Sequence, residues 1–366
     1  MNNYNLTKMA TQMFFPGNVA QLDDAGLPSI MVFIPAFKNS DVLNGGDDST
    51  HPAFIVNGKE VPGFYYSKYQ NVVHNGAAYS LPAEDPHVWC NLENAIKACE
   101  TKGNGWHLST AAEWAAVALW CKKNGFLPYG NNYYGRDSRE SKYKAIIANR
   151  GENGNIQRVA TGPGPLTWSH DGTPSGIWDM NGNVVEWQGG LRMVWGEVQI
   201  FANNDAADPS NPQNSTSTCW RAIKAADGSL VDPESKTTDT AVKTAGDTVK
   251  IDFINGAWQF ATGITSAENS VRGCFFHAVS CAATIGEKTK SLLRSLALLP
   301  DEGTNASDYE DDKVFFNNTT ERCPYRGGNW VNGANSGVFT LSCDNVRGGS
   351  SAGIGFRAAY IPDIIE

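Results

Sequence analysis

Glycine and asparagine together fill 70 of the 366 positions and occur along the whole chain. Glycine adopts positive φ angles without steric cost, and asparagine tolerates them while its side chain bonds local backbone. A chain of this kind is expected to be a loop-rich globular protein. Its length allows one large domain or two ordinary ones, so a sizeable core is possible.

Charge and hydropathy exclude two classes of partner. The net charge is -9, only 18% of residues are charged, and no cluster of Lys and Arg is present. Nucleic-acid binders need such clusters to neutralise phosphates, so no nucleic-acid partner is predicted. The longest apolar runs, such as residues 30–35, are far shorter than the roughly 20 residues that cross a bilayer, so no membrane insertion is expected. The N-terminal residues lack a basic region followed by an apolar stretch, so no signal peptide is predicted.

The eight cysteines and six histidines are dispersed. They contain no Cys-x-x-Cys pair, no His-x-His and no His-Glu-x-x-His, so no metal or nucleophile site is predicted from local spacing. The cysteines are interpreted as scattered buried thiols, and their disulfide state is left open.

Two helices are the clearest local predictions. In the first, apolar residues recur at i, i+3, i+4 and i+7 from Leu92, behind Asn91 as N-cap. In the second, Thr110 and Glu113 form a capping box, and the helix ends before Gly125. A third helix is predicted over residues 288–299, ending at a proline.

Strands are predicted over residues 30–37 and 64–69. Residues 1–29 are treated as an N-terminal arm, either a separate small unit or an edge strand. Residues 124–172 are interpreted as long ordered loops. Residues 203–249 have few large apolar side chains and are interpreted as an insertion rather than core.

Several motifs follow one another in a fixed order. They are Met-Val-Phe-Ile-Pro (31–35), Gly-Trp-His-Leu-Ser-Thr-Ala-Ala-Glu-Trp (105–114), Asp-Met-Asn-Gly-Asn-Val-Val-Glu-Trp (179–187), Arg-Gly-Gly-Asn-Trp (326–330) and Ile-Gly-Phe-Arg (354–357). This series resembles the formylglycine-generating-enzyme family. The resemblance implies an α+β fold, a loop-rich variant of the C-type lectin fold with two main helices and small antiparallel sheets. It spans one domain over residues 30–366, with residues 195–320 as a long insert.

These motifs and the residues beside them include candidate buried anchors and a candidate metal site. Trp114, Trp178 and Trp187 are expected to be buried, each covering on the order of 200 Å². In the family that the chain resembles, a Gly-Asn-x-x-Glu segment holds calcium, which makes Asn183 and Glu186 the candidate ligands of a structural Ca²⁺. A partner arginine or backbone amides for Glu186 are the alternative.

The enzymatic function of that family is not expected here. Its oxidation chemistry needs two close cysteines after the Arg-Gly-Gly motif, to bind copper as thiolates. Only Cys343 lies between Arg326 and Arg357. The chain is therefore predicted not to be an enzyme. An oxygen-dependent oxidase and a calcium-dependent glycan lectin remain the alternative functions.

The tail over residues 326–357 resembles the variable region of diversity-generating-retroelement target proteins, which include phage tropism determinants and bacterial surface lipoproteins. In those proteins, error-prone reverse transcription rewrites adenines, so that Asn codons become many residue types. One set of positions in this tail can be reached from an Asn codon by changing its first two bases. These candidate ligand-binding residues are Val331, Asn332, Asn335, Thr340, Ser342, Asp344, Asn345, Gly349, Ser351, Ala352 and Gly353.

The intervening positions have scaffold character. They are Gly327, Gly328, Trp330, Gly333, Gly337, Val338, Phe339, Leu341, Arg347, Ile354, Gly355 and Phe356. The resemblance implies a hypervariable binder of a protein or glycan on a cell surface, carried on a phage tail or a cell surface. An ordinary lectin-like surface without diversification is the alternative.

Overall fold

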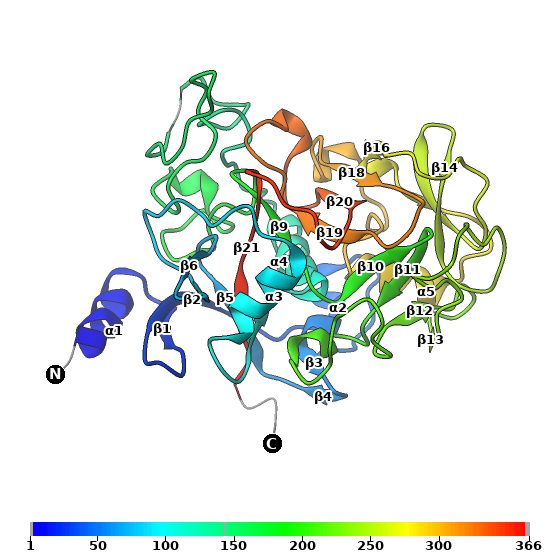
Figure 1. The fold of residues 1–366 in the computed structure, drawn as a ribbon, viewed down its shortest axis with the longest axis horizontal. Coiled ribbons are helices and arrows are strands. Elements are labelled where there is room, and N and C mark those ends of the chain that lie inside the picture. Colours follow the sequence, from blue (N-terminus) through cyan, green and yellow to red (C-terminus); the bar gives the residue numbers. More distant parts are fainter. Residues whose placement is uncertain (1–2, 143, 363–366) are drawn as a thin grey trace.

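The computed structural model describes residues 3–142 and 144–362 (Figure 1). This part of the chain contains five α-helices and 22 strands, and the strands form three larger sheets and two hairpins. The helices are α1 (Asn3–Phe14), α2 (Asn39–Val42), α3 (Leu92–Glu100), α4 (Ala111–Lys123) and α5 (Glu287–Ser295). The predicted mixed α+β class is confirmed.

The first sheet joins the two ends of the chain. All its pairs are antiparallel, and a strand from the C-terminal end lies between two strands from the N-terminal third. Its order is β1 (Asn18–Leu22), β2 (Pro28–Pro35), β5 (Gly63–Ser67), β22 (Ala358–Tyr360) and β8 (Trp106–Leu108). The predicted strands at residues 30–37 and 64–69 are β2 and β5. The first residues supply both the edge strand β1 and helix α1.

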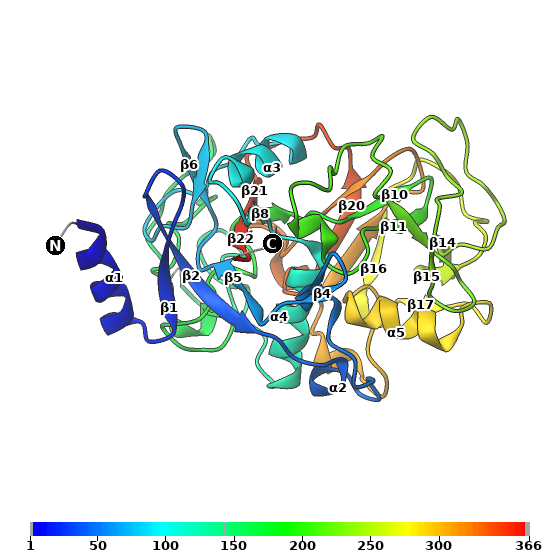
Figure 2. The ribbon, with the colours of Figure 1, turned by 90° about the horizontal axis from the view of Figure 1, so that it is seen from below.

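The second sheet lies at the opposite end of the long axis from α1 (Figures 1 and 2). It is built from residues 191–281. Its order is β13 (Leu230–Val231), β12 (Arg221–Ile223), β11 (Glu197–Ile200), β14 (Lys250–Ile254), β15 (Ala257–Ala261) and β17 (Ser280–Cys281), with β10 (Leu191–Val194) also paired to β11.

The third sheet combines the tail with distant segments. Its order is β16 (Arg272–Phe275), β18 (Lys313–Phe316), β20 (Leu341–Asn345), β19 (Cys323–Arg326), β9 (Val185–Trp187) and β21 (Ile354–Phe356). The hairpins are β3 (Ile55–Val56) with β4 (Lys59–Glu60), and β6 (Val72–His74) with β7 (Ala77–Tyr79). The sequence predicts antiparallel sheets, but three strand pairs are parallel. They are β18 with β20, β9 with β21 and β15 with β17.

Helix α4 lies in the centre of the core. Its N-cap Thr110 accepts the amide of Glu113, and the Glu113 carboxylate accepts the amide of Thr110, as the sequence predicts. Trp114 is fully buried, and its indole donates to the carbonyl of Val338 in the tail, at 2.7 Å. Trp178 and Trp187 are also buried, so all three predicted anchors are confirmed.

Two local predictions differ from the structure. Helix α5 ends at Ser295 rather than Leu299, because Ala297 adopts a positive φ of 48° that breaks the helical backbone. Residues 203–249 do contribute to the core: Trp220, Ile223 and Val249 are buried. The other large apolar side chains of this segment, Leu230, Val231 and Val242, are half-buried. No helix in the described ranges is both long and apolar enough to cross a membrane.

Candidate ligand-binding site

The interleaved pattern of the tail follows the alternation of strand β20. Successive side chains of a strand point to opposite faces of the sheet. Leu341 and Cys343 are fully buried in the core. Ser342 and Asp344, on the opposite face, line a cavity. In this strand the pleat therefore separates the scaffold position Leu341 from the candidate ligand-binding positions Ser342 and Asp344.

This cavity, of about 440 Å³, opens over the third sheet and is called here the tail cavity. Strands β9, β18, β19, β20 and β21 supply its floor, and the segments 328–332 and 349–351 supply its walls. The residues lining the tail cavity are Val185, Phe315, Tyr325, Gly328, Asn329, Asn332, Thr340, Ser342, Asp344, Asn345, Gly349, Ser350, Ser351 and Ile354.

Seven of the eleven candidate positions meet in the tail cavity: Asn332, Thr340, Ser342, Asp344, Asn345, Gly349 and Ser351. The other four lie around it. Val331 is exposed, Asn335 is half-buried, Ala352 lines a neighbouring hollow, and Gly353 is buried. The apolar scaffold positions Trp330, Val338, Phe339, Leu341, Ile354 and Phe356 are all buried.

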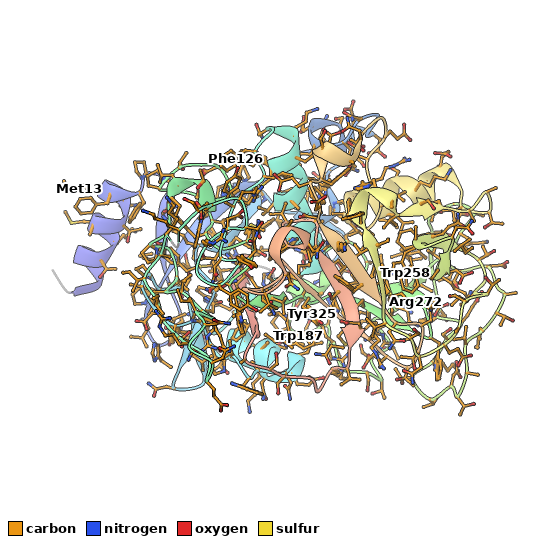
Figure 3. The ribbon with its side chains drawn as sticks, turned by 90° about the horizontal axis from the view of Figure 1, so that it is seen from above. Met13, Phe126, Trp187, Trp258, Arg272 and Tyr325 are labelled. Atoms are coloured by element: carbon orange, nitrogen blue, oxygen red, sulfur yellow. The ribbon has the colours of Figure 1, made fainter. Side chains whose placement is uncertain are left out.

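Tyr325 and Asp344 form the polar centre of the floor. The Tyr325 hydroxyl donates to Oδ1 of Asp344 at 2.7 Å. Burial raises the pKa of both groups above their ordinary values. The Tyr325 ring packs edge-on against Trp187, with 5.4 Å between ring centroids, which holds the phenol in place (Figure 3).

The segment 326–340 is held by glycine geometry and by one buried carboxyl group. Gly328 has a φ of +71°, and a Cβ there would lie 2.1 Å from Oγ of Ser336, so only glycine fits. The Ser336 hydroxyl donates to the carbonyl of Gly327 at 2.6 Å. Oδ2 of Asp312 accepts the amide of Phe339 at 2.8 Å, and burial raises the pKa of Asp312 to about 8.

Arg347 anchors the segment after β20. Its guanidinium forms two hydrogen bonds with Glu321, at 2.8 and 2.9 Å, and a third with Glu93 on α3, at 3.0 Å. Its carbonyl accepts the amide of Leu92, the first residue of that helix. The wall that carries Gly349 and Ser351 is therefore attached to the body of the protein at helix α3 and at the segment just before β19.

The two candidate calcium ligands have protein partners. Both oxygens of Glu186 accept hydrogen bonds from Arg357, at 2.5 and 2.6 Å, and one also accepts from Gln70. The side-chain oxygen of Asn183 accepts from the Asn131 amide and the Val159 backbone. An arginine partner neutralises the carboxylate, so these residues do not fit a calcium site. Within the described ranges, no group of three His, Cys, Asp or Glu side chains is placed to bind a metal.

The tail cavity offers mainly uncharged hydrogen-bonding groups. Asp344 is the only Asp, Glu, Lys, Arg or His among its lining residues. Amide, hydroxyl and backbone groups supply the remaining donors and acceptors, beside the aromatic rings of Phe315 and Tyr325.

Cys343 points away from the tail cavity into the core, and burial raises the pKa of its thiol well above the ordinary value. All eight cysteines are free thiols, not joined in disulfides, and six of them are buried.

Five lining residues were not among the candidates or the scaffold set: Val185, Phe315, Tyr325, Asn329 and Ser350. Asn329 and Ser350 carry residue types that the codon argument allows, so they could have been included. Phe315 falls in the segment interpreted as an insert, and no local pattern connects it with the tail.

No protein-family model matches this chain, and no curated protein matches it either. Among solved structures, it is similar to the Major Tropism Determinant P3c variant, at 10% identity and a TM-score of 0.30, over 93% of this chain and 70% of that one. The U1 variant of the same protein aligns at 11% identity and a TM-score of 0.31, over 90% of this chain and 62% of that one. Treponema denticola variable protein 1 aligns at 11% identity and a TM-score of 0.31, over 95% of this chain and all of that one.

Proposed function

We propose that this chain is a hypervariable ligand-binding protein that recognises a protein or glycan on a cell surface through the tail cavity. One observation carries the proposal. Seven positions whose codons are candidates for rewriting line one cavity, while the apolar positions between them are buried. Sequence diversity placed here would alter the ligand contacts and leave the frame intact.

The energetics of substitution support this division. Surface substitutions usually cost within about 0.5 kcal/mol, whereas truncating a buried Leu or Ile costs about 2–5 kcal/mol. A protein under repeated diversification keeps its fold only if changes avoid the second class. Leu341 and Phe339 belong to that class, since both are fully buried. Five of the seven cavity positions are half-buried, and the two buried ones, Thr340 and Ser342, carry small polar side chains.

The proposed role is recognition rather than catalysis. The lining holds one carboxyl group, Asp344, already hydrogen-bonded to Tyr325, and no cysteine. Selective binding would come from shape and from amide and hydroxyl contacts on a preorganised backbone. As in the variable proteins that the tail resembles, display on a phage tail or a cell surface in several copies would raise the overall affinity.

Two experiments test the proposal. The gene's neighbourhood is sequenced for a near-copy of the stretch encoding residues 326–357 that differs almost only at adenines, beside a reverse-transcriptase gene. Finding none would refute diversification. Separately, Asp344→Ala and Asn332→Ala proteins are compared with wild type for retention on candidate host cells, with exposed Val271→Ala as control. Unchanged retention at unchanged melting temperature would refute the cavity as the binding site.

A further inference from the structure

A second hollow, of about 610 Å³, adjoins the tail cavity across its wall. Ser351 lines the tail cavity, and the next residue, Ala352, lines the second hollow. The remaining lining residues come from outside the tail: Trp89, Asn149, Arg150, Gly151, Glu152, Asn153, Gln157 and Arg158. This second hollow is therefore built almost entirely from residues that diversification would leave constant.

Trp89 presents a large apolar ring to solvent on a firmly held backbone. Its side chain is 66% exposed, and its backbone has a φ of 57°, which is rarely adopted by a bulky residue. The Trp89 amide donates to the carbonyl of Ser351 at 3.0 Å. The following residue, Cys90, is buried, and its carbonyl accepts the indole of Trp187. The backbone that carries the exposed indole is thus held in place.

Polar groups that are free to bind surround this ring. Among the described residues, none hydrogen-bonds to the side chains of Asn149, Glu152 or Gln157, and these three are exposed or half-buried. Arg158 is mostly buried and is held by two hydrogen bonds to Asp85, at 2.7 and 2.9 Å. Its Nη1 also donates to the carbonyl of Ala352 at 3.2 Å, which ties the hollow to the wall of the tail cavity.

We propose that the second hollow is a constant subsite for one sugar ring of a cell-surface oligosaccharide, which stacks on Trp89 while the glycan continues into the tail cavity. A pyranose has an apolar C–H face that matches an exposed indole, and equatorial hydroxyls that match amide and carboxylate side chains. The lining is mostly polar apart from Trp89, which suits a sugar ring better than an apolar side chain. This inference rests on the proposed function and names the ligand class as a glycan.

The direct test uses an array of immobilised oligosaccharides of glucose, galactose, mannose and N-acetylglucosamine. Wild type is expected to bind members of the array, Trp89→Ala to bind them at least tenfold more weakly, and Trp89→Phe to lie between. Val271→Ala, which removes part of an exposed apolar side chain just before strand β16, serves as the matched control and should bind as wild type. Because Trp89 is exposed, its variants should keep the wild-type melting temperature.

A second readout follows the ring itself. The indole N–H resonance of Trp89, assigned by its loss in Trp89→Phe, should shift on addition of a soluble oligosaccharide retained by the array. No binding to any array member, or equal binding by Trp89→Ala, would overturn the subsite. If host-cell retention is lost in Asp344→Ala but unchanged in Trp89→Ala and after periodate oxidation of surface glycans, the tail cavity recognises a protein and only the subsite fails. If the Asp344→Ala and Trp89→Ala proteins are both retained on host cells as well as wild type, the proposed function fails too.

Discussion

Glu186 and Arg357 form a doubly hydrogen-bonded ion pair in which both side chains are fully buried. The two residues are 171 positions apart and join β9 to the residue that follows β21. Arg357 also donates to the carbonyls of Ser67 and Trp178, each at 3.0 Å. One guanidinium therefore links the first sheet, the third sheet and the loop residue Trp178.

Replacing Glu186 by Gln should destabilise the protein strongly. The change leaves a buried guanidinium without its counter-charge, which typically costs about 3–5 kcal/mol. Urea unfolding of Glu186→Gln measures this loss, with Glu287→Gln, at an exposed helix position, as a control that should match wild type. Equal stability of the two variants would contradict the structural role of the pair.

Removing calcium should have no effect on stability. Both oxygens of Glu186 are occupied by Arg357 and Gln70, so a cation would have to displace a buried arginine. Melting temperatures in excess EDTA and in millimolar calcium are expected to coincide. A calcium-dependent rise would instead support the metal site that the Gly-Asn-x-x-Glu segment suggested.

Neighbouring positions of strand β20 should differ sharply in their tolerance to truncation. Leu341→Ala creates a cavity in the core and should cost about 2–5 kcal/mol. Ser342→Ala removes one hydroxyl from the tail cavity and should cost less than about 1 kcal/mol. Chemical denaturation of both variants checks the difference, and similar losses would mean that the pleat does not separate frame from binding surface.

Truncating Arg347 should loosen the cavity wall. Arg347→Ala removes three charge-assisted hydrogen bonds from a mostly covered side chain. We expect a stability loss of about 1–3 kcal/mol and faster amide exchange over residues 348–353. Arg221→Ala, which breaks the solvent-exposed pair with Asp232, should cost within about 0.5 kcal/mol. Unchanged exchange in Arg347→Ala would show that other contacts hold the wall.

Asp312 should make stability fall as pH rises. Burial raises its folded-state pKa from 3.8 to about 8, so between these values the folded protein holds a proton that the unfolded chain has released. Stability linked to this group is therefore present at low pH and lost as pH rises through about 4–8. Asp312→Asn keeps an oxygen for the Phe339 amide and cannot ionise.

Melting curves of wild type and Asp312→Asn between pH 5 and 9 isolate this contribution. The variant should gain stability relative to wild type as pH rises. The comparison matters because His51 and His170, whose pKa values burial lowers to about 4, impose the opposite trend below about pH 6.5 on both proteins. Parallel curves would show that Asp312 is ionised in the fold.

Much of the local structure was predictable from the sequence because its causes are short-range. The capping box at Thr110 and Glu113 uses residues three positions apart, and the N-cap Asn91 accepts the amide of Asn94 as expected. The buried tryptophans were predictable from their size. The end of α5 was not, because the positive φ of Ala297 accompanies the packing of the following leucines into the core.

The candidate binding residues were predictable as a set, from residue types and a resemblance of the tail. Their convergence depends on the third sheet, where β20 lies between β18 and β19. Phe315 comes from β18, in the segment interpreted as an insert, and Tyr325 precedes the Arg-Gly-Gly motif. Neither contribution can be derived from a local pattern, because strand pairing over such separations depends on how the whole core closes.

The sequence by itself determined a loop-rich α+β chain, its two capped helices, and the alternation of buried and polar residues in its tail. Only the tertiary structure decided that seven of the polar positions line one cavity, that Glu186 faces Arg357 rather than a cation, and that Trp89 lies beside the cavity wall. The physical reason is the distance along the chain over which the interactions act. Caps, turns and strand alternation arise from interactions a few residues apart, whereas a cavity and a buried ion pair arise from contacts between segments that only folding brings together.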